Sequence, residues 1–393
     1  MRYAFLALLM VVSSGCAALG GPQAQQSGPI KLGMVTSLTG NYAPLGTNNK
    51  LAVQQVIDAT NAKGGINGRR IEIDTLDDAS DPNQSVVQFN KLVDEGVVAV
   101  LGPPQSTSDL AIRPLANDKK VPIISLGASD EQVIPPTPYM WQVAPLSSQV
   151  ANVCLGYIKQ QGKTRLAMLY DTKNAYAVFG HDASTKLLGQ YGLTLVDDET
   201  FELGQNNFAP QFSKIADAKP DFLLVWATGA PPVIITKQWA DARNGIPLMM
   251  TAAEASPLYI QPSGEAAEGV YVQASMGAIG KSLPSTNKFK KAIDDFAGPF
   301  EQANKYYPPQ FAWDGMIAIT FLLDAISRKG ADRESIRSGL DSAEFDTPQG
   351  HYTYRPDKHY GMPDSANLMS IVKNADFLPA PGVTDDQLTK AGQ

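Results

Sequence analysis

The chain has 393 residues, and its 32 Lys and Arg against 39 Asp and Glu give a formal net charge of −7. At about 100–200 residues per domain, this length predicts two or three domains. Charged residues make up 18% of the chain and apolar residues 44%, which excludes a chain disordered throughout. The acidic balance argues against nucleic acid as a partner. Two cysteines and three histidines exclude a disulfide scaffold, and we expect neither a metal site nor a cofactor.

The N-terminus has the pattern of an export signal. Arg2 precedes an apolar run, Tyr3–Val12, which is followed by the small residues Ser13–Gly15. This run is too short to span a bilayer, and no later segment approaches the roughly 18 uninterrupted apolar residues of a membrane helix. The sequence therefore predicts a signal peptide over residues 1–15 and a mature protein that works outside the cytoplasm.

Ser14-Gly15-Cys16 resembles the end of a bacterial lipoprotein signal, in which the cysteine is lipidated and becomes the new N-terminus. Ser13 departs from that motif, which usually has Leu, so a secretory signal cut near Ala17-Ala18 is the alternative. Residues 16–28 are small or polar and uncharged, as in a flexible tether. We expect a lipid anchor at Cys16 that holds the protein to a membrane, in the periplasm or at the cell surface.

Beyond residue 28, short β-rich apolar runs alternate with stretches of helical periodicity. The expected strands are 30–37, 70–76, 97–101, 121–125, 140–143, 165–170, 193–198, 221–227, 247–251, 270–274, 349–354 and 370–372. The expected helices include 48–62, 81–95, 108–117, 287–296 and 311–328. This alternation predicts βαβ units, with parallel sheets covered by helices on both faces. So many strands predict an α/β fold of two lobes.

Polar and small residues follow the predicted strands, where open parallel sheets bind their ligands. The candidates that these strand ends supply are Ser106, Gly127, Ser129, Tyr176, Thr228 and Glu254. Ser106–Ser108 also open a helix, whose free N–H groups favour a bound carboxylate. A helix cap is the alternative explanation for Ser106 or Ser108 taken singly.

Motifs of common enzymes are missing. The sequence has no Gly-x-Ser-x-Gly, no His-Glu-x-x-His and no Cys-x-x-Cys. We therefore expect a binding protein, and no enzyme.

Several segments in order resemble the leucine/isoleucine/valine-type periplasmic binding proteins. They are Thr39-Gly40, Asn61–Ile73, Asp77–Pro82, Gly102-Pro103 with Ser106, and Glu254 with Ala267–Val270. The resemblance runs from about Lys31 to Val372.

This resemblance implies a type I periplasmic binding protein fold, with two parallel-sheet α/β lobes joined by three crossovers near Pro145, Ser275 and His359–Gly361. Lobe 1 would comprise residues 29–145 plus 276–360, and lobe 2 residues 146–275 plus 361–385. The implied function is that of a monomeric receptor. It would close by a hinge on a small-molecule ligand and deliver it to the permease of an ABC transporter.

The resemblance also implies roles for residues of the site. Ser106 would hold the α-carboxylate of an amino acid, and Ser129 would contact both its carboxylate and its ammonium. The carbonyl of Gly127 would accept from the ammonium, Glu254 would be the acidic partner of that ammonium, and Tyr176 would close from the second lobe.

The expected side-chain pocket departs from the family. Leu45 and Thr228 stand where aromatic residues are common, and Phe311 and Trp226 could compensate as pocket walls. Packing in the core is the alternative for Trp226. Two other functions stay open at this point: a ligand sensor of the same fold, and a transport receptor for aromatic acids or amides.

Overall fold

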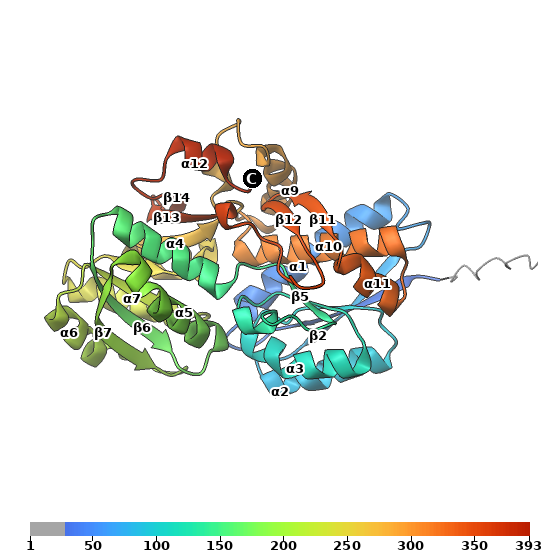
Figure 1. Cartoon of the computed structure of the whole chain (residues 1–393), viewed down its shortest axis with the longest axis horizontal. Helices are drawn as coiled ribbons and strands as arrows, with labels where there is room; N and C mark the ends of the chain where they lie inside the picture. Colours follow the sequence, from blue (N-terminus) through green and yellow to red (C-terminus); the bar gives the residue numbers. More distant parts are fainter. Residues whose placement is uncertain (1–27) are drawn as a thin grey trace, which may run out of the picture.

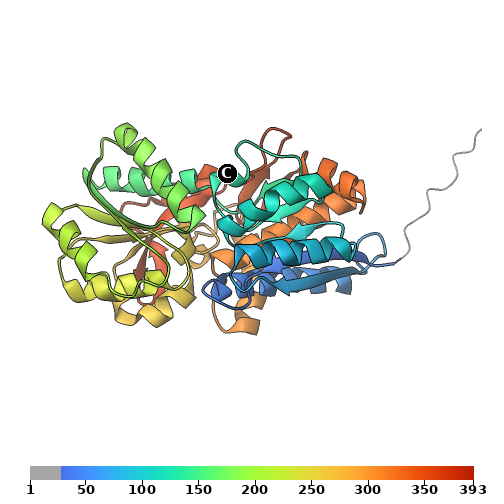
Figure 2. The same ribbon diagram turned by 90° about the horizontal axis from the view of Figure 1, so that it is seen from below.

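The computed structural model describes residues 28–393, which form two α/β lobes that lie side by side (Figures 1 and 2). The predicted signal peptide and Cys16 lie outside the described residues. Within the described part, none of the helices combines the length and apolar character that crossing a membrane requires.

The first lobe is built on a five-stranded parallel sheet in the order β2-β1-β3-β4-β5. Its strands are β1 (Ile30–Thr36), β2 (Ile71–Asp77), β3 (Val100–Leu101), β4 (Ile123–Ser125) and β5 (Met140–Gln142). The helices of this lobe are α1 (Ala43–Ala62), α2 (Pro82–Asp94), α3 (Ser106–Lys119), α9 (Lys290–Asn304), α10 (Gln310–Lys329) and α11 (Arg333–Leu340). The hairpin of β11 (Glu344–Thr347) and β12 (Gly350–Thr353) follows α11.

The second lobe is built on a seven-stranded sheet in the order β14-β13-β10-β9-β8-β6-β7. Its strands are β6 (Arg165–Asp171), β7 (Thr194–Phe201), β8 (Phe222–Trp226), β9 (Leu248–Met250), β10 (Tyr271–Ser275), β13 (Asn367–Lys373) and β14 (Asp376–Pro379). Its helices are α4 (Ser147–Gln160), α5 (Ala175–Tyr191), α6 (Ala209–Ala218), α7 (Pro231–Ala242) and α8 (Pro257–Ser263). Only β13 and β14 of the strands in this sheet run antiparallel to their neighbours, and the last helix, α12 (Asp385–Lys390), follows them.

The predicted α/β class is confirmed, and each strand expected from the sequence is present with ends shifted by no more than three residues. Helix α1 differs more, because it begins at Ala43 and the pattern predicted Asn48. Gly46 concealed this first turn, since glycine is a poor helix former. Here glycine is required: a Cβ at Gly46 would lie 2.1 Å from the carbonyl oxygen of Ser37. The close approach of helix and strand overrides the local preference.

Within the described residues the chain passes between the two sheets three times: after β5, after β10 and between β12 and β13. The third passage is held at both ends. The N–H of Gln142 in β5 donates to the carbonyl of His359 (2.8 Å), and Gln149 of α4 donates through Nε2 to the carbonyl of Met362 (3.0 Å). The segment is therefore fixed to the first lobe at His359 and to the second at Met362. We expect bending between the lobes at Tyr360-Gly361.

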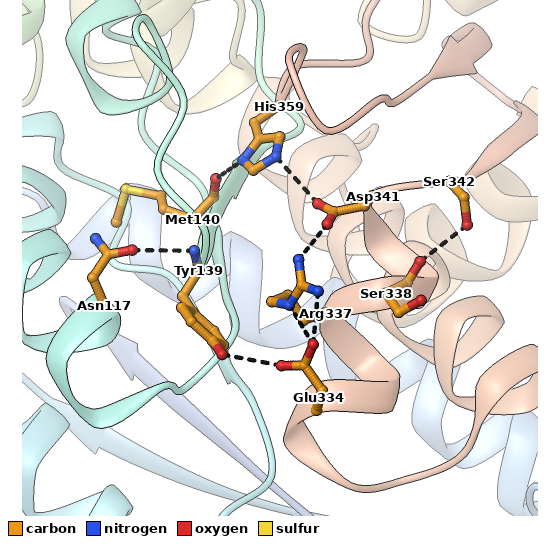
Figure 3. Close-up of polar contacts among 9 residues, drawn as sticks. All are labelled: Asn117, Tyr139, Met140, Glu334, Arg337, Ser338, Asp341, Ser342 and His359. Atoms are coloured by element: carbon orange, nitrogen blue, oxygen red, sulfur yellow. Dashed lines mark hydrogen bonds and ion pairs between the residues drawn. The ribbon is translucent and has the colours of Figure 1, made fainter.

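A chain of polar contacts anchors His359 to the first lobe (Figure 3). The His359 ring stacks on Trp141 of β5 at 4.8 Å between centroids, and its Nδ1 lies 2.9 Å from the carbonyl oxygen of Met140. Its Nε2 lies 3.2 Å from Asp341, which pairs with Arg337 of α11 at 2.6 Å. A buried aromatic stack with polar partners on both sides leaves this ring little freedom, so the anchor is rigid.

Trp226 belongs to the core of the second lobe. Its ring is fully buried, and its Nε1–H donates to Ser184 Oγ of α5 at 3.2 Å. It lines neither cavity described below, so the prediction of Trp226 as a pocket wall is wrong and its alternative, core packing, is correct. The strand explains why: Phe222, Leu224 and Trp226 share one face of β8, and that face is covered by α4 and α5.

The contact between Trp226 and α5 gives a stability test. A Cβ at Gly180 would lie 2.2 Å from the Trp226 ring. We predict that Gly180→Ala lowers the free energy of unfolding by about 1–3 kcal/mol, because the buried ring has no room to move. Gly189→Ala, on the same helix with nothing within 4 Å of the new Cβ, is the matched control. It should leave stability unchanged or raise it by up to about 1 kcal/mol. Urea unfolding of both variants checks this, and equal changes would contradict it.

Candidate functional site

A cavity lies between the lobes, at the carboxyl ends of strands from both sheets. It holds about 450 Å³ of space between protein atoms, including its mouth. Six residues predicted from the sequence line it: Leu45, Ser106, Gly127, Tyr176, Thr228 and Phe311. Ser106, Gly127, Tyr176 and Thr228 follow strands that are far apart in the chain, as the strand-end rule predicts. Leu45 and Phe311 come from helices α1 and α10.

Ser106 is the first residue of α3, with Gln105 in the cap position. The hydroxyl of Ser106 accepts from the N–H of Ala128 (3.1 Å), which ties the start of α3 to the loop after β4. The predicted alternative, that Ser106 is only a helix cap, is therefore wrong. The first N–H groups of a helix have no partner within it and carry the positive end of its dipole. Ser106 thus stands at a place suited to a ligand carboxylate.

The buried carboxyl group of Asp109 holds the loop after β4 in place by hydrogen bonds. Asp109 of α3 is fully buried, and its Oδ2 accepts from Ser125 Oγ (2.9 Å) and from the N–H of Gly127 (3.2 Å). Burial is the main cause that raises the Asp109 pKa well above its usual range. These bonds fix Gly127, which has no room for a side chain, since a Cβ there would lie 2.5 Å from Asp109. The glycine backbone is thereby held against the cavity.

From the second lobe, Tyr176 and Thr228 close the opposite wall. Tyr176 is 4% exposed, and its ring packs against Trp226 in an edge-to-face arrangement at 5.2 Å. Trp226 therefore acts on the site through Tyr176. Asn174, which caps the start of α5, also lines the cavity. Its side-chain nitrogen donates to Thr228 Oγ1 at 2.7 Å.

Glu254 lies in an adjoining cavity that shares Leu45, Ala253 and Phe311 with the first. Its side chain is 2% exposed, and Thr251 Oγ1 donates to its Oε2 at 3.2 Å. Burial is the main cause that raises the Glu254 pKa well above its usual range, and no cationic group contributes to the shift. Glu254 does not cap the following helix, because Ser256 caps α8.

Ser129 is placed differently from its prediction. It is fully buried and lines neither cavity, and its hydroxyl donates to Glu131 Oε2 at 2.7 Å. That hydroxyl is therefore engaged with a neighbouring carboxylate. Donation from this hydroxyl to a ligand carboxylate would require the Glu131 bond to break.

Two polar residues of the cavity escaped the sequence analysis, namely Gln310 and Asp314 at the start of α10. The helix was predicted as a buried apolar element, which it is. The available signal was the presence of two polar residues four apart in an otherwise apolar helix, which places both on one face.

Direct hydrogen bonds join the two lobes beside the cavity. Asn174 Nδ2 donates to the hydroxyl of Tyr42 (3.1 Å), and the N–H of Ala175 donates to Thr107 Oγ1 (3.1 Å). The described structure is therefore a closed arrangement, in which α3 of one lobe meets α5 of the other.

This geometry is that of a two-lobed binding protein, and the comparisons agree. Residues 29–376 match the family described as periplasmic binding protein, and the chain belongs to that family. The Leu/Ile/Val-binding protein BraC3 of Rhizobium johnstonii is 24% identical over 83% of this chain and 87% of its own length. The protein is thus a solute-binding protein of this family.

Solved structures share the fold. The branched-chain amino acid transporter substrate-binding protein LivJ of Streptococcus pneumoniae, in complex with isoleucine, superposes with a TM-score of 0.79 at 21% identity, covering 89% of this chain and 97% of that one. A solute-binding protein of an ABC transporter from R. palustris, in complex with benzoate, gives 0.78 at 20% identity, covering 90% and 96%. The predicted type I fold is confirmed.

The bond between the lobes generates a prediction about affinity. Thr107→Val removes the acceptor of the Ala175 N–H without changing the size of the side chain. One hydrogen bond contributes about 0.5–1.5 kcal/mol, so we predict ligand binding weaker by about two- to tenfold. Thr194→Val, at an exposed position of β7, is the control and should bind as the wild type does. Calorimetry with the best-binding amino acid measures both, and an equal change in the two variants would contradict the prediction.

Proposed function

We propose that the protein is the extracytoplasmic receptor of an ABC transporter, and that it binds an amino acid, branched-chain or similarly apolar, between its closing lobes. Three features support this. The start of α3 at Ser106 suits a carboxylate, Leu45 and Phe311 supply apolar walls, and Glu254 supplies an acceptor.

Glu254 is the observation on which the proposal mainly rests. A carboxyl group buried without a cation is costly unless a partner arrives. The ammonium of an amino acid would be such a partner, because Ala253 and Phe311 line both cavities and a ligand beside them would lie next to the cavity of Glu254. Removing one member of a buried charge pair costs about 3–5 kcal/mol. Amino-acid binding should therefore depend strongly on Glu254.

An aromatic acid without an amine is a second candidate ligand, favoured by a specific observation. The hydroxyl of Ser129 faces Glu131, and Glu254 lines the adjoining cavity, so the acceptors expected for an ammonium do not meet at the Ser106 wall. The similar protein from R. palustris was solved with benzoate.

The proposal includes a lipid anchor at Cys16, which would hold a monomeric receptor beside the permease. The motif Ser14-Gly15-Cys16 supports it. Labelling with a radioactive fatty acid should follow the wild-type protein and vanish in Cys16→Ser. Several acyl chains on one cysteine would hold the protein stably to the membrane, because each methylene group buried in the bilayer contributes about 0.8 kcal/mol to binding. Absence of label on the wild type would contradict the anchor.

Substitution of Glu254 separates the two ligand classes. We predict that Glu254→Gln weakens amino-acid binding by about 100-fold or more. This factor corresponds to the lower end of the about 3–5 kcal/mol given above, since about 1.4 kcal/mol changes the affinity tenfold. Calorimetry against a panel of amino acids and aromatic acids measures this. Because the Glu254 pKa is raised in the free protein and an ammonium lowers it, binding should also release protons, seen as a buffer-dependent heat.

Glu265→Gln, an exposed acid shortly after α8, is the matched control and should bind as the wild type does. A loss below about threefold in Glu254→Gln, or tighter binding of an acid that lacks the amine, would reject the amino acid as ligand and leave the receptor fold intact.

A further inference from the structure

Asp314 is a buried acid in the cavity that the proposed function does not use. It lines the cavity from α10 and is 1% exposed. Its Oδ1 accepts from Gln310 Nε2 at 2.9 Å, and Gln310 is the neighbour on the preceding helical turn. A buried acid that faces a ligand cavity needs a partner, because burial without one is costly.

The groups around Asp314 include no cation that could pair with it. Burial raises the Asp314 pKa to about 8, and Gln310 is the only group that opposes the shift. The phenol of Tyr352 on β12 is close enough for the charge of Asp314 to raise its pKa, and Glu254 lines the adjoining cavity. Among residues 28–393, no Lys, Arg or His forms an ion pair with Asp314. At neutral pH the group is thus mainly protonated.

The orientation of Gln310 determines which oxygen carries the proton. The N–H of Ser275 donates to Gln310 Oε1 (3.4 Å), so the amide nitrogen is the atom that faces Asp314. Since Oδ1 of Asp314 accepts from that nitrogen, the proton of the neutral acid lies on Oδ2. Oδ2–H is a donor that needs an acceptor, and among residues 28–393 no group forms a hydrogen bond with Oδ2.

We propose that Asp314 acts as a neutral carboxylic acid that donates a hydrogen bond to an oxygen on the side chain of the ligand. This inference rests on the proposed function as an amino-acid receptor, and it replaces the apolar side chain of the ligand by a polar one of similar size. Among amino acids of branched-chain size, the site would favour those that carry a hydroxyl or amide oxygen over isosteres that lack one. A site whose buried donor is left unpaired by the wrong ligand discriminates strongly, whereas apolar walls alone discriminate weakly.

Two near-isosteric pairs of amino acids test the inference by calorimetry at pH 7: threonine with valine, and asparagine with leucine. We expect the oxygen-bearing member of at least one pair to bind the wild type tenfold or more tightly than its partner. In Asp314→Leu the preference should reverse, because the donor is gone and the wall becomes apolar.

Asp314→Asn keeps an acceptor for Gln310 and a donor on the other atom, so it mimics the neutral acid. It should retain the preference for the oxygen-bearing amino acid. This variant keeps the test decisive if the Leu variant does not fold. The wild type should largely lose the preference between pH 7 and pH 8.5, as Asp314 ionises and its donor is lost, while the ammonium of the ligand stays mainly protonated. The Asn variant should keep its preference over this range. Asp324→Asn, on the exposed end of the same helix, is the matched control and should behave as the wild type does.

The outcomes are distinguishable. Equal or tighter binding of both valine and leucine to the wild type would overturn the inference and leave the amino-acid receptor standing. A loss of preference above pH 8 that persists in Asp314→Asn would also overturn it, because another group would then titrate. Failure of every amino acid to bind would overturn the proposed function together with the inference.

Discussion

The site depends on one constraint of chain geometry: parallel strands all end at the same edge of their sheet. The loops after β3 and β4 therefore lie together in the first lobe, and those after β6, β8 and β9 lie together in the second. Residues from both sets of loops line the cavity, which therefore lies between the two edges. Because each lobe supplies only one wall, the binding of a ligand and the closing of the lobes are coupled.

The connections between the lobes limit how closure occurs. His359 is held rigidly to β5 by its stack on Trp141 and by its polar partners, and Met362 is held to α4 (Figure 3). We therefore expect movement to be concentrated in the short segment between them. Gln310 adds a further link, since it contacts Ser275, the last residue of β10, and also Asp314 in the cavity. The part of the cavity wall that α10 supplies is thus joined to the passage between the lobes that follows β10.

Much of the fold and part of the site could be predicted from the sequence. The period of apolar residues located the strands, and the strand-end rule located Ser106, Gly127, Tyr176 and Thr228. The resemblance to a family supplied the roles. What the sequence could not show was decided by tertiary contacts. The first turn of α1 exists because Gly46 lets helix and strand approach, against its own preference.

Tertiary contacts also explain the positions of Trp226 and Asp314, whereas a local bond explains that of Ser129. Trp226 is the last residue of β8 and shares the face of Phe222 and Leu224, which is buried in the core. Thr228 lies beyond the end of the strand and lines the cavity. The partner of Ser129, Glu131, lies only two residues away, and periodicity carries no information about such a local bond. Asp314 was hidden in an apolar helix, and only the structure shows that its face meets the cavity.

Closure of the two lobes on a bound amino acid is tested most directly by small-angle X-ray scattering of the mature chain. The radius of gyration is measured without ligand and with the best-binding amino acid at saturation. Hinge closure predicts a smaller radius of gyration in the bound state, because the free protein samples open arrangements in which the Thr107 and Asn174 bonds are broken. An unchanged radius at saturation would mean that the lobes do not move on binding, which would contradict the account.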